Sequence, residues 1–383
     1  MERIQRRLAQ TSSPSHSRFL WGPLQLLSVH SDLDVFLLLL PVLSLAVCLL
    51  SILLHAQASH ARRFLLELLN RKGSDVGAVA SSCVERNEEK PDEEAKKRGK
   101  ETHSTQEQGD EAHGENKEES PTEKKRNNRL KVALVVAHPD DEVMFFTPTL
   151  ALLRDFSEHV QVHLLCLSTG NAAGLGRVRS REFLNAARLF GVENGNALVL
   201  DDEALQDGWG LWSPERVADV VEEFIEKNEI STIFTFDERG VSRHPNHISV
   251  FRGVRLLHER QRARGNARPG GSERQRAEGK DERGGVTKRG RHSRERGEAR
   301  MSQTDVYLLQ SHGLFRKYMG VLDVILSTVA CRKKPNRIAS VKLTPFLSIR
   351  GMSSHWSQFV WFRWMFVFFS SYTYTNVFDR ITV

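Results

Sequence analysis

Four short apolar segments alternate with helical patterns between residues 130 and 237, and this alternation leaves few folds open to the chain. The apolar segments are LKVALVVA (130–137), VQVHLLCLSTG (160–170), NALVLDD (196–202) and STIFTFD (231–237). Helical patterns fill 148–156, 176–192 and 213–229 between them, and the pattern continues with a helix at 246–257 and a strand at 304–310. Strands that alternate with helices predict an α/β fold, with a Rossmann-like, mostly parallel sheet and helices on both faces.

The segment VFLLLLPVLSLAVCLLSILL, from Val35 to Leu54, carries no charge over 20 residues. A helix rises about 1.5 Å per residue, so this run spans roughly 30 Å, the thickness of a bilayer core. A cleaved signal peptide has a shorter apolar stretch nearer the N-terminus. We therefore expect a single transmembrane helix at 35–54, after a short N-terminal segment (1–34).

Basic residues are distributed unevenly around the apolar run. Arg62, Arg63, Arg71 and Lys72 follow it closely, whereas Arg18 lies alone at a similar distance before it. Because positive flanks tend to stay in the cytosol, we expect the chain after the helix to face the cytosol.

Two polar blocks interrupt the apolar pattern. Residues 85–129 contain almost no apolar side chains, and we expect 55–129 to form a disordered tether. Residues 258–301 are rich in Gly, Arg and Glu and read as a basic insertion in a surface loop. The polar content lies largely in these blocks, so the rest of the chain can still bury a core.

The net charge of +7 is concentrated in the basic insertion. Residues 258–300 hold 14 Lys and Arg against 7 Asp and Glu, which accounts for the whole surplus. Such a tract can bind RNA or anionic lipid, or it can be a solvated loop. We favour the solvated loop, so nucleic acid is not an expected partner, and no obligate protein partner is evident.

The four cysteines are scattered along the chain and form no CxxC pair. Cys48, Cys83, Cys166 and Cys331 therefore indicate neither a disulfide framework nor a thiolate metal site. Cys166 lies within an apolar strand and reads as a core residue.

The segment FVWFRWMFVFF (359–369) is aromatic and apolar but too short to cross a membrane. It fits a buried core helix or a segment that rests on a bilayer surface, because Trp favours that zone. Residues 371–383 are expected to form a C-terminal tail.

The first polar cluster follows the first predicted strand. In AHPDDE, the side chains of His138, Asp140, Asp141 and Glu142 come where functional groups gather on a parallel sheet. His138 and Asp141 are three residues apart and can turn toward one point to bind a divalent metal. Asp140 and Glu142 would then point elsewhere.

The second polar cluster follows the fourth predicted strand, in GVSRHPNH. His244 and His247 are three residues apart in a loop that enters a helix, so both can lie on one face. Three protein ligands with an open position are typical of catalytic zinc, and His138, Asp141 and His247 would supply them. Either cluster alone can be a turn, but two after separate strands favour a reaction site.

The two clusters together resemble the LmbE-like (PIG-L) family of metal-dependent deacetylases. LSTGNAAGLGRVRSRE (167–182) is similar to that family's sugar-site loop and the helix after it. LQSHGLFRKYMGVLDV (309–324) and MSSHWSQFVWFRWMFVFF (352–369) resemble its eukaryotic branch, the N-acetylglucosaminyl-phosphatidylinositol de-N-acetylases. The resemblance covers about 130–257 and 302–370, which we expect to form the LmbE-like deacetylase domain.

The resemblance implies a role for each residue of the two motifs. His138, Asp141 and His247 match the ligands of a divalent metal, for which zinc is expected. Asp140 matches the general base. His244 matches the residue that stabilises the oxyanion and protonates the leaving amine.

Four further residues receive roles from the resemblance. Asn171, Arg179 and Glu182 lie where the family places residues near the substrate, and Glu142 is expected to support the metal ligands from behind. Two positions depart from relatives. Arg243 replaces a small residue and is expected to alter access, and Asn246 replaces an Asp of some bacterial relatives and is expected to change the tuning of His244.

The resemblance implies metal-dependent hydrolysis of the N-acetyl group of N-acetylglucosaminyl-phosphatidylinositol, giving glucosaminyl-phosphatidylinositol and acetate. This is the second step of glycosylphosphatidylinositol (GPI) anchor biosynthesis, at the endoplasmic reticulum membrane with the catalytic domain in the cytosol. The apolar run argues independently for a membrane glycolipid substrate. The alternatives are a deacetylase of a soluble N-acetylglucosaminide, and a membrane-anchored adaptor that binds RNA or anionic lipid through the basic insertion.

Overall fold

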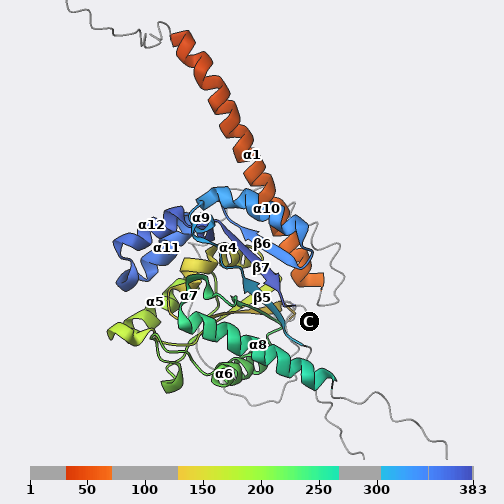
Figure 1. Cartoon of the computed structure of the whole chain (residues 1–383), viewed down its shortest axis with the longest axis vertical. Coiled ribbons are helices and arrows are strands. Elements are labelled where there is room, and N and C mark those ends of the chain that lie inside the picture. Colours follow the sequence, from red (N-terminus) through yellow and green to blue (C-terminus); the bar gives the residue numbers. More distant parts are fainter. Residues whose placement is uncertain (1–31, 71–127, 267–302, 344, 382–383) are drawn as a thin grey trace, which may run out of the picture. The chain divides into compact units, whose positions relative to one another are not determined.

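A seven-stranded mixed sheet forms the centre of the protein (Figure 1). The computed structural model describes residues 32–70, 128–266, 303–343 and 345–381. The strands are β1 (Leu130–Val136), β2 (Val160–Cys166), β3 (Ala197–Val199), β4 (Thr232–Phe236), β5 (Asp305–Leu309), β6 (Arg337–Val341) and β7 (Thr375–Arg380). Their order is β3-β2-β1-β4-β5-β7-β6; the first five run parallel, and β7 pairs antiparallel with both β5 and β6. This confirms the mostly parallel α/β fold.

Helices cover the sheet on both faces, as predicted. They are α1 (Asp32–Asn70), α4 (Asp141–Asp155), α5 (Gly176–Leu189), α6 (Pro214–Asn228), α7 (Gly240–Arg243), α8 (Pro245–Asn266), α9 (Leu314–Lys317), α10 (Asp323–Lys333), α11 (Phe346–Ser354) and α12 (Trp361–Phe369). Short 3₁₀ turns lie at η2 (Asn171–Ala173), η3 (Glu203–Leu205), η4 (Gly320–Leu322), η5 (Trp356–Gln358) and η6 (Ser371–Thr373). Figure 1 shows α6 and α8 together on one side of the sheet and α10 on the other.

The strand order reverses its direction between β1 and β4. β1 pairs with β2 on one side and with β4 on the other, so the chain leaves β1 in one direction and returns to its far side later. In open α/β sheets such a reversal of strand order marks the usual ligand site. The two polar clusters of the sequence follow these two strands.

The predicted C-terminal tail is wrong, because residues 375–380 form a strand inside the sheet. The sequence TNVFDR has little apolar alternation, and buried hydrogen bonds hold it instead. The Asn376 amide accepts from the Thr149 hydroxyl at 2.7 Å and donates to the Phe145 carbonyl at 2.7 Å. A buried Asn with its partners satisfied fits a central strand that periodicity does not predict.

The predicted tether begins too early, because α1 continues through residues 55–70. Phe64, Leu65 and Leu68 recur at helical spacing and are at most 2% exposed. The Phe64 ring stacks on Phe234 of β4 with centroids 5.7 Å apart, and Arg63 donates to the Cys331 carbonyl at 3.1 Å. Burial of each such apolar side chain stabilises the fold by about 2 kcal/mol. This half of α1 is therefore part of the core. Residues 71–127 lie outside the described residues.

The boundary of the basic insertion also differs from the prediction. α8 runs to Asn266 instead of ending near residue 257. Arg260 pairs with Asp219 of α6 at 2.6 Å, and Arg264 pairs with Glu222 of the same helix. These ion pairs between α6 and α8 stabilise the helical conformation of the first basic residues of the predicted insertion. Residues 267–302, which hold most of the predicted insertion, lie outside the described residues.

The helix α1 is long and apolar enough to cross a membrane, and it is the single such helix among the described residues. By length and composition the candidate span is Ser44–Leu69. From Leu53 onward, however, several side chains are buried, among them Ala56, Phe64 and Leu68. The second half of the candidate span is therefore partly buried against the folded domain, whereas the predicted run Val35–Leu54 precedes most of these buried residues.

Candidate metal and catalytic site

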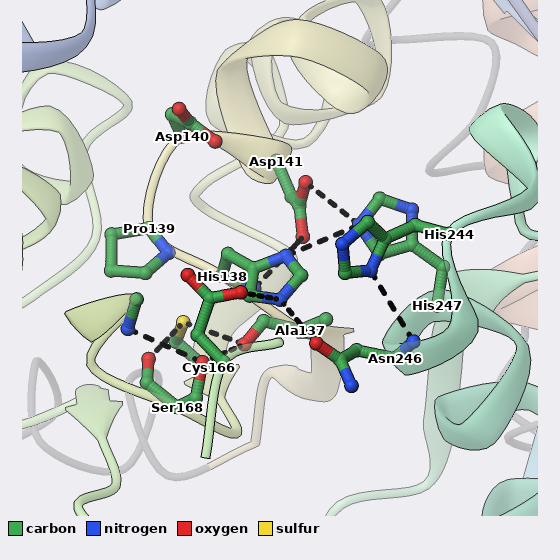
Figure 2. A network of polar contacts seen from close by, with 12 residues as sticks. Ala137, His138, Pro139, Asp140, Asp141, Cys166, Ser168, His244, Asn246 and His247 are labelled. Carbon is green, nitrogen blue, oxygen red and sulfur yellow. Dashed lines mark hydrogen bonds and ion pairs between the residues drawn. The ribbon is translucent and has the colours of Figure 1, made fainter. Parts of the chain in front are cut away.

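The turn between β1 and α4 separates the side chains of Asp140 and Asp141. Asp140 has a left-handed backbone with φ 103°, which is uncommon outside glycine. Its amide donates to the Glu142 carboxylate at 3.0 Å, and the His138 amide donates to Asp141 at 2.8 Å. Figure 2 shows the result: Asp141 turns toward the histidines and Asp140 turns away. The structure brings His138 and Asp141 together, as the sequence predicted.

His138, Asp141 and His247 form a compact group of possible ligand atoms. His247 Nε2 lies 3.2 Å from Asp141 Oδ1 and 3.3 Å from His138 Nδ1, and His138 Nδ1 lies 3.5 Å from Asp141 Oδ2. Ligand atoms at about 2.0–2.1 Å from one tetrahedral zinc ion stand about 3.3 Å apart. The nitrogens of His138, His244 and His247 also lie within 4.8 Å of one another.

The hydrogen-bond partners of the two ligand histidines fix their tautomers. His247 Nδ1 lies 3.0 Å from the Gly240 carbonyl, which can only accept, so Nδ1 carries the proton. His138 Nε2 likewise faces the Asp207 carboxylate at 3.2 Å and the Asn246 Oδ1 at 2.9 Å. The lone pairs of His247 Nε2 and His138 Nδ1 are therefore directed at each other and at Asp141. Three acceptors in contact need a proton or a cation between them, and this donor set fits a divalent metal.

Without a cation, proton sharing holds the group together. Burial lowers the pKa of His138, but the hydrogen bonds to Asp141 and Asp207 outweigh it and raise the pKa to about 10. Burial raises the pKa of Asp141, yet His247 and His138 hold it well below its usual range. A metal would replace that proton, since binding requires neutral imidazole and ionised carboxylate.

Gly240 allows His247 to reach this position. Its backbone is left-handed with φ 59°, and a Cβ there would lie 2.7 Å from the His247 Cβ. No real Cβ fits at that distance, so a side chain at position 240 would displace the histidine. The glycine of GVSRHPNH therefore has a steric role in the site.

Two arginines contact the carboxylate of Asp140. Arg363 from α12 pairs with Oδ2, and Arg179 from α5 lies 3.5 Å from the same atom. Arg179 also donates to the carbonyls of Pro139 at 2.7 Å and Gly170 at 2.8 Å. Arg179 is 8% exposed and thus braces the loop that carries Asp140. It lies within the site, as predicted, but its contacts are to protein groups.

His244 lies at the edge of the ligand group. Its ring centroid is 4.9 Å from that of His138 and 5.3 Å from that of Trp209. Its Nδ1 accepts from the Asn246 amide at 3.3 Å, so Nε2 carries the proton and can donate. Burial, with His138 and His247 adding repulsion, lowers the pKa of His244 to about 4. A neutral imidazole with a free N–H suits stabilisation of an oxyanion.

The structure places the weaker predictions in supporting positions. Asn171 accepts from the Gly176 amide at 2.9 Å at the start of α5, and Glu182 accepts from the Ser357 amide at 2.8 Å. Neither contact involves the ligand group. Glu142 is fully buried and joins the Asp140 amide to His355 Nε2, at 2.5 Å from the latter. These contacts support the turn that carries Asp140, and the predicted support of the metal ligands stays a prediction.

Sequence reasoning missed Asp207, His355 and Arg363. Asp207 lies in the Gly-rich segment before Trp212, and His355 precedes η5, and neither stood out in the sequence. Arg363 did carry a signal, because it is the one charge in FVWFRWMFVFF. A lone charge in an apolar segment usually has a partner, here Asp140. Asn246 adds a bond to His138 that explains its place in HPNH.

Comparison with known proteins gives one family. Residues 133–258 match the family described as PIG-L: GlcNAc-PI de-N-acetylase. The chain is 34% identical over 256 residues to a probable N-acetylglucosaminyl-phosphatidylinositol de-N-acetylase of Schizosaccharomyces pombe, covering 66% of this chain and 87% of the relative. It is 32% identical over 244 residues to the de-N-acetylase of that name from Bos taurus, covering 63% and 80%. A solved N,N'-diacetylchitobiose deacetylase from Pyrococcus horikoshii is 16% identical with a TM-score of 0.38, covering 67% and 85%.

Proposed function

Because this chain belongs to the PIG-L family of GlcNAc-PI de-N-acetylases, we propose that it hydrolyses the N-acetyl group of N-acetylglucosaminyl-phosphatidylinositol (GlcNAc-PI). The products are glucosaminyl-phosphatidylinositol and acetate, as in the second step of GPI-anchor biosynthesis. The observation that carries the proposal is the contact of His138, Asp141 and His247 beside an Asp140 that points away from them.

The ligand group would hold a divalent metal, for which we propose zinc. His138 and His247 supply neutral nitrogen lone pairs and Asp141 supplies the anionic oxygen, a set that suits zinc. A bound divalent metal lowers the pKa of water toward neutrality and polarises an amide carbonyl.

Asp140 carries out the proton transfers, and His244 supplies a hydrogen bond to the developing charge. Asp140 removes a proton from the attacking water, and Arg179 and Arg363 hold its carboxylate in place for this. His244 donates its Nε2 proton toward the oxygen that gains negative charge. As the C–N bond breaks, Asp140 passes the proton that it removed from water to the amine of the sugar, and acetate is released.

The anchor helix supports a substrate that stays in a membrane. α1 is long and apolar enough to cross a bilayer, which a deacetylase of a soluble sugar does not need. We propose a single-pass protein of the endoplasmic reticulum membrane with the catalytic domain in the cytosol, since basic residues follow the apolar run.

The test is acetate release from GlcNAc-PI by detergent-solubilised protein. Wild type is expected to turn over, Asp140→Asn to lose about 10³-fold in rate with its metal retained, and chelator to abolish turnover until zinc is restored. Asp201→Asn, a change at an exposed carboxylate between β3 and η3, is the matched control and should match wild type. A folded, metal-loaded wild type that ignores GlcNAc-PI but cleaves a soluble N-acetylglucosaminide would reject the glycolipid assignment.

A further inference from the structure

The helix α12 exposes an unusual amount of apolar surface. Phe366 and Val367 face inward, at 9% and 2% exposure. Six of its nine residues form what we call the α12 face: Trp361, Phe362, Trp364, Met365, Phe368 and Phe369, exposed between 41% and 74%. A contiguous apolar surface of this kind on a folded protein marks a place where something other than water makes contact.

The α12 face continues onto its neighbours. α12 packs with α11, η4 and η6, and Figure 1 shows α9, α11 and α12 close together. Leu314 and Phe315 on α9 are 72% and 93% exposed, and Phe346 at the start of α11 is 71% exposed. Trp356, just before α12, is 75% exposed. The exposed apolar surface therefore extends beyond α12 and is larger than a single exposed aromatic side chain.

The charges in this part of the chain have one sign. Residues 311–378 contain nine Lys and Arg and a single acidic residue, Asp323. Asp323 is fully buried and pairs with Arg316 at 2.6 Å. Next to the α12 face, the Lys317 ammonium lies 5.9 Å from the centroid of the Phe366 ring. Among the described residues of this segment, a cation and no free carboxylate therefore lies beside the aromatic rings. That combination complements the phosphate groups of a phospholipid layer.

We propose that the α12 face is a membrane-contact surface that rests in the headgroup layer of a phospholipid bilayer. Trp and Phe favour the boundary between headgroups and acyl chains, and basic residues nearby contact phosphate. A helix of nine residues rises only about 14 Å, too short to cross the bilayer core. Of the two alternatives left open by the sequence, a core helix or an interfacial segment, this selects the second.

The same helix also contacts the carboxylate of Asp140, which connects the α12 face with the proposed reaction site. Arg363 is on α12 and pairs with Asp140, so the membrane-contact surface lies directly beside the residue proposed as base. A lipid-linked sugar could enter the site without leaving the bilayer. This step rests on the proposed function, whereas the membrane contact itself does not.

The contact is tested on the full chain reconstituted in phosphatidylcholine vesicles that contain 20 mol% anionic lipid, about the cytosolic-leaflet range. Acyl chains brominated near the headgroup quench tryptophan fluorescence on contact. The variant Trp361→Phe/Trp364→Phe is expected to lose most of the quenching that wild type shows. Leu198→Trp, which adds a tryptophan at an exposed position on the sheet edge, should add fluorescence that is not quenched. Equal quenching in wild type and the double variant overturns the proposal, and a concentration-dependent dimer in the same samples would assign the face to a second copy.

A second measurement separates the contact from the chemistry. Trp361→Ser/Phe368→Ser should lower hydrolysis of vesicle-borne GlcNAc-PI about tenfold and leave hydrolysis of a water-soluble short-chain analogue unchanged. Leu198→Ser, an equally exposed apolar change elsewhere, should affect neither. Equal loss on both substrates overturns the membrane role. Quenching without hydrolysis of either substrate by wild type supports the membrane contact and rejects the proposed function instead.

Discussion

The ligand group is buried, whereas the α12 face, on the helix that carries Arg363, is exposed to water. His138, Asp141 and His247 are at most 6% exposed, whereas Trp361 is 74% exposed. Charged groups are buried and aromatic rings are exposed, the reverse of the usual arrangement in a soluble protein. The buried charges contact each other, and the proposed cation would stabilise them further, while the proposed bilayer contact would cover the exposed rings. The difference teaches that two regions with opposite exposure can each offer a binding surface, one for a cation and one for a bilayer, and both assignments are open to test.

The largest effect is expected where the buried charge is removed. Asp141→Asn keeps the shape but takes away the anion that faces His138 and His247. Bound metal should fall below stoichiometric amounts, and turnover should drop about 10³-fold or more. Metal content by atomic emission and acetate release measure the two. A variant that keeps its metal and its rate would show that the carboxylate is no ligand.

A smaller effect is expected from crowding the ligand group without changing it. Gly240→Ala places a methyl group 2.7 Å from the His247 Cβ at φ 59°. We expect metal affinity and turnover to fall about 30-fold. Gly195→Ala is the matched control, because it has φ 91° with nothing within 4 Å of the new Cβ. If both variants lose equally, backbone strain and not displacement of His247 is responsible.

A buried imidazole outside the site, that of His163 on β2, sharpens the comparison with the ligand histidines. Both ring nitrogens of His163 on β2 lack a hydrogen-bond partner in the described part of the chain. Burial, with Lys131 adding repulsion, lowers its pKa to about 4, so the unfolded chain takes up a proton first as pH falls from 6.5. The contribution of His163 to stability is therefore full above pH 6.5 and is lost toward pH 4, by about 3 kcal/mol.

The variant His163→Phe should remove that part of the pH dependence. Denaturation midpoints in detergent at pH 7.5 and pH 4.5 make the comparison, with wild type alongside. An unchanged difference between the two pH values would locate the acid sensitivity in other groups.

The smallest effect is expected at the arginine that joins the two regions. Arg363→Ala leaves Asp140 with Arg179 alone, 3.5 Å away. A base that is less well oriented should lower kcat about tenfold with little change in KM, and Arg363→Lys should restore part of the loss. Arg350→Ala, an exposed basic residue on α11, should match wild type. A rise in KM at unchanged kcat would instead assign Arg363 to substrate binding.

Where local pattern carries the information, the sequence predicted the structure. Of the four strands from Leu130 to Phe236, β1, β2 and β4 are short buried runs, and β3 is a partly exposed run at the sheet edge. Their parallel arrangement follows from the helices between them. The two histidine clusters were found because each comes directly after one of these strands. Their meeting depends on β1 and β4 being neighbours, which the strand order provides.

Where pairing is distant, the sequence was insufficient. β7 is held by Asn376 bonds to Thr149 and Phe145, more than 220 positions away, and no periodicity records them. Arg363 and His355 reach the site from the C-terminal helices in the same way. The packing of Phe64 on Phe234 likewise extends the core into a segment predicted as tether. The roles assigned to the site residues stay predictions until the variants are made.

The second half of α1 has a consequence for residues 71–127. Since Phe64, Leu65 and Leu68 are buried in the core, this segment leaves the folded domain at Asn70 and returns to it at Leu130. Its length therefore does not set how far the apolar half of α1 lies from the folded domain, because α1 itself joins them. A protease cut within it would yield two pieces that stay associated. A truncation that starts at residue 130 would remove the buried side chains of Phe64, Leu65 and Leu68 and leave a cavity in the core.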